Sequence, residues 1–199
     1  MKGVALATED ELSEVVGQKL VSDAGAGLAV ILALRRNGFG YLRSRMRNFC
    51  ELSRQMPVLL LTDLDTAQCP MTLIGDWSRK NVVPDGLIFR VAVPQVESWL
   101  LADRESMARF FKVSLRRLPS NPDGLSNAKR ILLQLASKAP RRVREELLAV
   151  RGATAGQGLG YNTILSDFVR HQWHPARAAT RSDSLSRARM RLAELAAGS

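Results

Sequence analysis

An uninterrupted apolar run near the middle of the chain constrains the fold more than any other feature. Val58 to Leu61 are all apolar, and the run ends at Thr62-Asp63-Leu64-Asp65. A strand with one face in water alternates apolar and polar residues, whereas a strand covered on both faces is apolar throughout. The run therefore predicts a strand of a mainly parallel sheet with helices on both of its faces.

Strand and helix signals alternate on either side of this run. The capping-box pattern Thr8-Glu9-Asp10-Glu11 follows a short apolar segment and precedes periodic apolar residues, which predicts a strand and then a helix. Similar patterns predict strands at 4–7, 28–34, 57–62 and 86–93, and helices at 10–22, 41–55, 70–79 and 94–101. This order predicts a doubly wound α/β domain over residues 1–103.

Strand candidates disappear after Asp103, a residue suited to cap the helix that follows it. Helices are expected at 104–111, 127–137, 141–150, 161–171 and 184–197, with a turn at 119–123 and a flexible glycine-rich loop at 152–160. No internal repeat or sharp linker separates the two halves. We therefore expect residues 104–199 to form a basic helical extension packed on the α/β domain.

Apolar content and cysteine usage limit the class of protein. Hydrophobic residues make up 46% of the 199 residues, which is enough to bury a sizeable core. The longest uncharged apolar stretch, 25–34, is about half the ~20 residues of a membrane span, and no signal peptide opens the chain. Cys50 and Cys69 lack a metal-binding spacing, and His171 and His174 have no third ligand nearby. We expect a cytoplasmic protein with no membrane, disulfide or zinc site.

Positive charge is concentrated in the second half of the chain. The net charge is +10, and Lys plus Arg number 8 against 8 Asp plus Glu in residues 1–65, 3 against 4 in 66–103, and 18 against 7 in 104–199. This asymmetry favours an anionic partner, with nucleic acid the obvious candidate. The best phosphate-contact candidates are Arg116, Arg117, Arg141, Arg142, Arg144, Arg187 and Arg191. The alternative is that arginine-rich surface helices reflect only a GC-rich coding sequence.

Acidic residues follow the predicted strands. Glu9 comes after the first strand, Asp63 and Asp65 after the third, and Glu97 opens the helix after the fourth. The carboxyl ends of parallel strands share one edge of the sheet, where ligands bind. Carboxylates that converge there repel one another unless a cation compensates, and hard oxygen ligands indicate Mg²⁺ or Mn²⁺. Each residue also has a structural alternative, as a helix cap or as a favourable charge in a first helical turn.

These residues resemble a known family. A strand followed by Glu9 and, about fifty residues later, a strand that ends in Asp63-x-Asp65 is similar to the TOPRIM domain of topoisomerases, bacterial primases and the overcoming-lysogenization-defect nucleases. Segments 58–65 and 93–103 resemble a TOPRIM-like family of uncharacterised bacterial proteins, often encoded beside an ATPase in phage-defence loci. Later features of that family match Asn127-Ala128-Lys129, Gly160-Tyr161-Asn162 and Ser184-Leu185.

The resemblance implies a TOPRIM-like nuclease that hydrolyses phosphodiester bonds with Mg²⁺ or Mn²⁺. The roles it implies fall on Glu9 (metal ligand or general acid/base), Asp63 and Asp65 (metal ligands) and Lys129 (a stabiliser of phosphoryl charge). Glu97 and Asp103 match the family's E-x-W-x-x-A-D pattern, which by itself assigns them no role, and Glu97 is counted as a further candidate metal ligand. It also implies nucleic acid and an AAA- or ABC-type ATPase as partners in phage defence. Asp10 stands where many TOPRIM domains have glycine, which is a departure from the family pattern.

Two other functions stay open. The chain could be a non-catalytic nucleic-acid-binding or regulatory module with a vestigial acidic site. It could also be a phosphoacceptor receiver domain, which carries acids after its first and third strands. A receiver is shorter than this chain and needs a lysine after a later strand, and no lysine stands at a predicted strand end after Asp65. The receiver class therefore ranks last.

Overall fold

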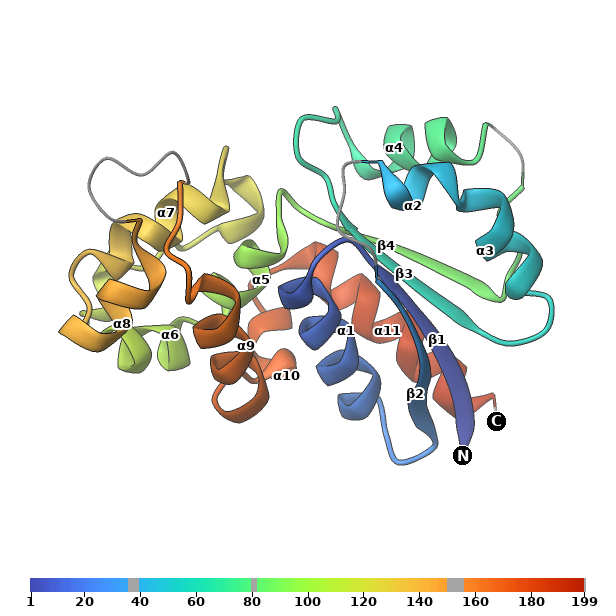
Figure 1. Ribbon diagram of the computed structural model, residues 1–199. Coiled ribbons are helices and arrows are strands. Elements are labelled where there is room, and N and C mark those ends of the chain that lie inside the picture. Colours follow the sequence, from blue (N-terminus) through green and yellow to red (C-terminus); the bar gives the residue numbers. More distant parts are fainter. Residues whose placement is uncertain (36–39, 80–81, 150–155, 199) are drawn as a thin grey trace.

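Four parallel strands form the centre of the structure, a computed structural model that describes residues 1–35, 40–79, 82–149 and 156–198 (Figure 1). The strands are β1 (Lys2–Thr8), β2 (Leu28–Arg35), β3 (Val58–Asp63) and β4 (Leu87–Ala92). They lie in the order β2-β1-β3-β4, and every adjacent pair is parallel. The predicted α/β class with a parallel sheet is therefore confirmed, and all four expected strands are present.

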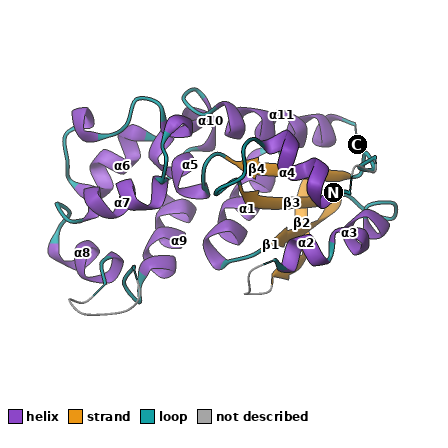
Figure 2. Ribbon diagram, turned by 90° about the horizontal axis from the view of Figure 1, so that it is seen from above, coloured by secondary structure: helices purple, strands orange, loops and turns teal. Residues whose placement is uncertain are grey.

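Helices cover both faces of this sheet (Figure 2). One hydrophobic core joins the sheet to α1 (Glu11–Asp23), α5 (Val96–Ala102) and α11 (Asp183–Ala197), and a second joins it to α2 (Tyr41–Ser44), α3 (Met46–Leu52) and α4 (Pro70–Trp77). On β3, Leu59 and Leu61 belong to the first core, whereas Val58 and Leu60 belong to the second. Burying each side chain contributes roughly 1.5–3 kcal/mol, which explains why this strand is apolar without interruption.

The helical half lies beyond the carboxyl ends of the strands and shares the first of these cores (Figure 1). It comprises α6 (Arg104–Phe111), α7 (Ala128–Ala136), α8 (Arg141–Leu147), α9 (Tyr161–His171) and α10 (Pro175–Ala179), with 3-10 turns at Leu115–Arg117 and Pro122–Gly124. α9 packs against α1, and α11 returns along the sheet against β4. The buried Trp173 indole N–H donates to the Trp99 carbonyl at 3.1 Å, which ties the helical half to α5.

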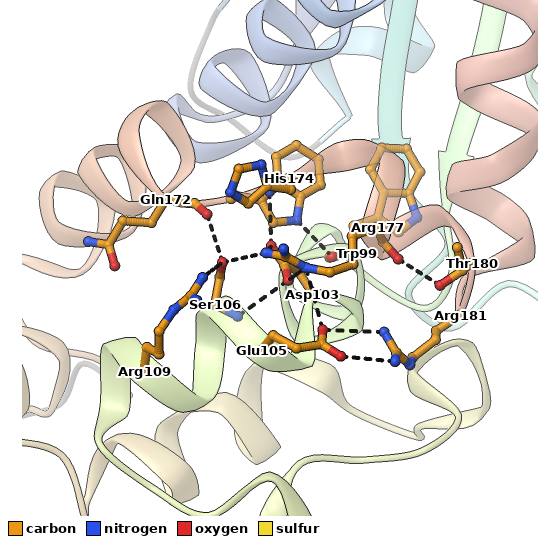
Figure 3. A network of polar contacts seen from close by, with 11 residues as sticks. Trp99, Asp103, Glu105, Ser106, Arg109, Gln172, His174, Arg177, Thr180 and Arg181 are labelled. Atoms are coloured by element: carbon orange, nitrogen blue, oxygen red, sulfur yellow. Dashed lines mark hydrogen bonds and ion pairs between the residues drawn. The ribbon is translucent and has the colours of Figure 1, made fainter.

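A buried ion pair fixes the helical half to the end of α5 (Figure 3). The fully buried Asp103 accepts hydrogen bonds from Arg177 Nε at 2.6 Å and Nη2 at 2.9 Å, and from the amides of His174 and Ser106. Burial alone would raise the pKa of Asp103, but Arg177 and the two amides outweigh it and hold this pKa below its usual value. Asp103 caps α6, as its place in the sequence predicts, and it also anchors α10.

The start of α5 differs from its prediction. A helix was expected at 94–101, but α5 begins at Val96. The Pro94 carbonyl is held outside the helix, where it accepts the amides of Leu64 and Asp65 at 3.0 Å each. A contact between segments distant in the sequence therefore delays the helix by two residues.

Two other helices end three residues before their predicted ends. The helix expected at 41–55 is interrupted at Arg45, which lies between α2 and α3 with φ −101° and ψ 7°. Its amide is shared between two carbonyls of the preceding turn, a bifurcated bond common at helix ends. The helix expected at 141–150 ends at Leu147, because Leu148 is extended.

Candidate functional site

Hydrogen bonds to the end of β4 fix the path of the chain after β3. The Leu64 amide donates to the Ala92 carbonyl at 2.9 Å, and the Asp65 amide donates to the Pro94 carbonyl. Leu64 is buried in the core that includes α4. Asp65 is exposed with φ 49°, a left-handed conformation in which Asp is enriched. The loop therefore places Asp63 and Asp65 on either side of a buried leucine.

Asp63 is the centre of a group of carboxylates. Its Oδ1 accepts the Val96 amide at 2.8 Å, which joins β3 to the first turn of α5, and no described residue donates to its Oδ2. Burial raises the pKa of Asp63 well above its usual value, and the charges of Glu97, Asp65 and Asp10 raise it further, while the Val96 amide opposes them. Carboxylates that follow β1, β3 and β4 therefore act on one another at a single edge of the sheet.

Glu9 follows β1 and is half-buried at this edge. Burial raises the pKa of Glu9, and the charges of Asp65 and Asp10 add to the increase. Asp10 also has a structural role, because its Oδ1 accepts the Ser13 amide at 2.7 Å and caps α1. The predicted capping box is therefore wrong in its first residue: Thr8 still belongs to β1, so Asp10 is the N-cap.

Glu97 lies in the first turn of α5 and is only 5% exposed. The Tyr161 hydroxyl, at the start of α9, donates to Glu97 Oε1 at 2.6 Å. Burial raises the pKa of Glu97, whereas the Tyr161 hydrogen bond and the charge of Lys129 lower it. The fourth acidic candidate is therefore held by groups from the helical half.

Lys129, in the first turn of α7, is connected to the acidic residues through two other side chains. Its amide donates to Gln95 Oε1 at 3.2 Å, and Gln95 Nε2 donates to Asp65 Oδ1 at 3.3 Å. Its ammonium lies 4.8 Å from the centroid of the Tyr161 ring. Neither Gln95 nor Tyr161 was predicted as a site residue, because each contact joins segments that only the fold brings together.

A cleft of about 270 Å³ opens at the acidic edge. Its lining includes Glu9, Asp63 and Asp65 from the strand ends, and Arg43, Asp76 and Trp77 from α2 and α4. Arg43 is exposed and forms no ion pair within the described part of the chain. An arginine on a short helix gives no sequence signal of what it faces, so Arg43 was not predicted as a site residue. The cleft thus presents carboxylates and one guanidinium to the same space.

The donor chemistry of this edge suits a hard divalent cation. Within the described ranges, no three His, Cys, Asp or Glu side chains come together closely enough to hold an ion between them. Mg²⁺ often uses only one or two carboxylates and keeps several of its waters, so Asp63 and Asp65, with Glu9 nearby, fit this requirement. A cation beside Asp63 would also offset the burial and the neighbouring carboxylates, which together raise the pKa of this residue.

The predicted phosphate-contacting arginines lie on different parts of the surface. Arg116 and Arg117 are exposed on the 3-10 turn after α6, and Arg141, Arg142 and Arg144 are exposed on α8. On α11, Arg187 pairs with Asp183, and Arg191 pairs with Glu194 and donates to the Asp85 carbonyl just before β4. Arg191 therefore lies at the opposite edge of the sheet from Asp63, and α8 and α11 lie apart (Figure 1).

No protein-family model matches this chain, and no curated protein or solved structure is significantly similar to it. The resemblance to a TOPRIM-like family therefore stays a prediction. Among the helices of the described residues, none is both long and apolar enough to cross a membrane. What is shown is a parallel α/β sheet whose carboxyl edge carries acidic residues in the lining of a cleft.

Proposed function

We propose that the chain is a metal-dependent, TOPRIM-like nuclease that hydrolyses phosphodiester bonds in nucleic acid. The observation that carries the proposal is the crowding of negative charge around Asp63 in the lining of an open cleft. Such crowding raises the energy of the folded state unless a cation offsets it, so its presence at the ligand-binding edge of a parallel sheet favours a functional site.

The chain's own residues fall into distinct roles in this proposal. Asp63 and Asp65 would hold the cation, with Val96 orienting the Asp63 carboxylate through its amide. Glu9, half-buried with a raised pKa, would accept a proton from the attacking water and return it to the leaving oxygen. The chemistry that bound Mg²⁺ or Mn²⁺ supplies is polarisation of the phosphate and a lower pKa for a water molecule.

Positive side chains would hold the substrate. Arg43 faces the cleft and would pair with a phosphate next to the one that is cleaved. The exposed arginines of α8, Arg141, Arg142 and Arg144, would contact the backbone further along the strand. An ATPase partner in phage defence belongs to the same proposal but rests on the sequence resemblance alone.

A non-catalytic nucleic-acid-binding module is the second candidate. The observation that favours it is that no three metal-ligating side chains are grouped among the described residues, whereas exposed arginines are plentiful in the helical half. In this case the acidic edge would be vestigial, and binding would not depend on a divalent cation.

The test is cleavage of end-labelled single-stranded DNA, duplex DNA and RNA by the purified chain with Mg²⁺, Mn²⁺ or EDTA. We expect metal-dependent cleavage that Asp63→Ala reduces by more than 100-fold, since even residues that only support a metal ligand typically contribute 10- to 100-fold. Asp85→Asn is the matched control, because Asp85 is an exposed carboxylate at the other edge of the sheet and should leave the rate unchanged.

Two outcomes would decide against the nuclease. Cleavage that survives Asp63→Ala would come from a contaminant or a different site. Binding of nucleic acid without cleavage under any metal condition would favour the non-catalytic module.

A further inference from the structure

Tyr161 is a buried polar side chain that the roles above leave unused. It is 2% exposed, and its hydroxyl donates to a carboxylate that is itself almost fully buried, Glu97, at 2.6 Å. That length falls in the range of charge-assisted O–H···O⁻ bonds, which are roughly twice as strong as neutral ones. The bond therefore holds one oxygen of Glu97, the residue that follows Val96, whose amide donates to Asp63.

The ring of Tyr161 makes a second contact at the same site. The Lys129 ammonium lies 4.8 Å from the ring centroid, within the distance at which a cation is attracted to an aromatic face. The Lys129 amide is bonded to Gln95, which in turn reaches Asp65. One side chain therefore places both a carboxylate and a positive charge near the strand ends.

Tight backbone packing fixes the position of Tyr161. The Tyr161 amide donates to the Gly158 carbonyl at 3.2 Å, and the Gly158 amide donates to the Leu147 carbonyl at the end of α8 at 2.8 Å. A Cβ at Gly158 would lie 2.2 Å from the Glu146 carbonyl oxygen, so only glycine allows this approach. Gly158 is therefore closely packed, unlike the flexible loop expected at 152–160, whereas Gly156 and Leu159 are exposed. Residues 152–155 lie outside the described ranges.

We propose that Tyr161 is a positioning residue of the acidic site, which orients Glu97 through its hydroxyl and Lys129 through its ring. The inference rests on the proposed function and deepens it: the helical half completes a site that the strand ends begin. Glu97 follows Val96, whose amide orients the Asp63 carboxylate. Holding Glu97 in place would therefore support the proposed ligand Asp63 from outside, as in sites where outer residues orient metal ligands.

The test compares Tyr161→Phe with Tyr41→Phe in the full chain. Tyr161→Phe removes the hydroxyl but keeps the aromatic ring that the Lys129 ammonium contacts. Tyr41 is the other tyrosine of the chain, half-buried against Phe49 on the opposite face of the sheet, and no described residue bonds its hydroxyl. The readouts are Mn²⁺ affinity by calorimetry, and kcat and KM for cleavage of a labelled oligonucleotide.

We expect Tyr161→Phe to lower kcat and to weaken Mn²⁺ binding, each by about 10- to 100-fold, with KM within about twofold of the parent. Tyr161→Leu, which also removes the ring, should have the larger effect, while Tyr41→Phe should match the parent. Melting temperatures identify a variant that fails to fold. If Tyr161→Leu fails to fold, Tyr161→Phe still tests the role of the hydroxyl, because the Phe variant keeps the ring that packs in the core.

Two results would overturn the inference, and they are distinguishable. If Tyr161→Phe matches the parent in kcat and Mn²⁺ affinity while Asp63→Ala loses both, Tyr161 is only part of the core and the nuclease proposal stands. If the parent chain neither binds Mn²⁺ nor cleaves, the proposed function fails and the positioning role fails with it.

Discussion

Replacing Arg177 by alanine should destabilise the fold by about 3 kcal/mol, because it leaves the charge of Asp103 without its counter-ion. The Asp103 carboxylate is fully buried and accepts two bonds from the guanidinium, at 2.6 and 2.9 Å. Hydrogen bonds to charged groups contribute about 1.5–3 kcal/mol each, and breaking a buried pair by removing one partner costs about 3–5 kcal/mol.

We take the lower end of that range for two reasons. The Arg177 side chain is 34% exposed, so solvent screens part of the interaction. The amides of His174 and Ser106 still donate to Asp103 in the variant. For a chain of this length, 1 kcal/mol shifts the melting temperature by about 2–4 °C, so the expected decrease is about 6–12 °C.

The assay is thermal unfolding followed by circular dichroism at pH 7, with Arg187→Ala as the control. The Arg187–Asp183 pair has both side chains at least 70% exposed, and such pairs contribute at most about 1 kcal/mol. Adding Asp103→Asn to the Arg177→Ala variant should recover part of the loss, because it removes the uncompensated charge. A melting temperature for Arg177→Ala as close to the parent as that of Arg187→Ala would refute the reasoning.

The pH dependence of unfolding tests independently whether the ion pair of Asp103 stabilises the fold. The folded-state pKa of Asp103 is below its usual value, so the stabilisation is present above about pH 4, the pKa in the unfolded chain, and is lost as the pH falls through the folded value. The difference between the parent and Arg177→Ala should therefore shrink in acid.

Two further predictions concern charge. Asp63→Asn should raise the melting temperature at pH 7. The folded-state pKa of Asp63 is raised, so the charged Asp63 side chain destabilises the fold increasingly as the pH rises above about 4, and Asn removes this charge. Scanning calorimetry at pH 7 and pH 3.5 measures this, and a gain that persisted at the lower pH would contradict the explanation by charge. Reversing Arg141, Arg142 and Arg144 to Glu should weaken nucleic-acid binding and flatten its salt dependence, since each phosphate contact on duplex DNA contributes about 0.9 to the slope of log binding constant against log salt concentration. Fluorescence anisotropy from about 50 to 200 mM salt measures both the affinity and this slope. An unchanged slope would exclude α8 from the contact surface.

The sheet and the gathering of the acidic residues followed from local patterns. The apolar run at Val58–Leu61 required a strand covered on both faces, and its observed bounds shift by one residue from those predicted. Because the carboxyl ends of parallel strands share an edge, the same reasoning placed Glu9 and Asp63 at one edge of the sheet, and both line the cleft there. It did not predict that no three acidic side chains of the described residues group closely enough to hold an ion. Helices α6 and α9 have the predicted bounds, since periodicity and end signals agreed for both.

What the sequence did not disclose depends on contacts between distant segments. Tyr161 and Glu97 are 64 residues apart, and their bond exists because α9 and α5 belong to one core. The ion pair of Arg177 with Asp103 is likewise a product of folding. The pairs of Arg141, Arg187 and Arg191 are local to their helices, at spacings of three or four residues. Counting basic residues therefore overstated the number of side chains left for a partner. The five-residue helix α10 was too short to show a period.

The position of α11 has a consequence for synthesis on the ribosome. Leu185, Ala188 and Leu192 complete the core on one face of the sheet and pack in the same cluster as Ile88 of β4. The four strands are finished by Ala92, whereas α11 begins at Asp183, and translation of the intervening chain takes roughly 5–20 s. During that interval α1 and α5 can cover part of this face, but the part beside β4 lacks the cover that α11 supplies. Premature termination before α11 would leave this part of the face exposed to aggregation.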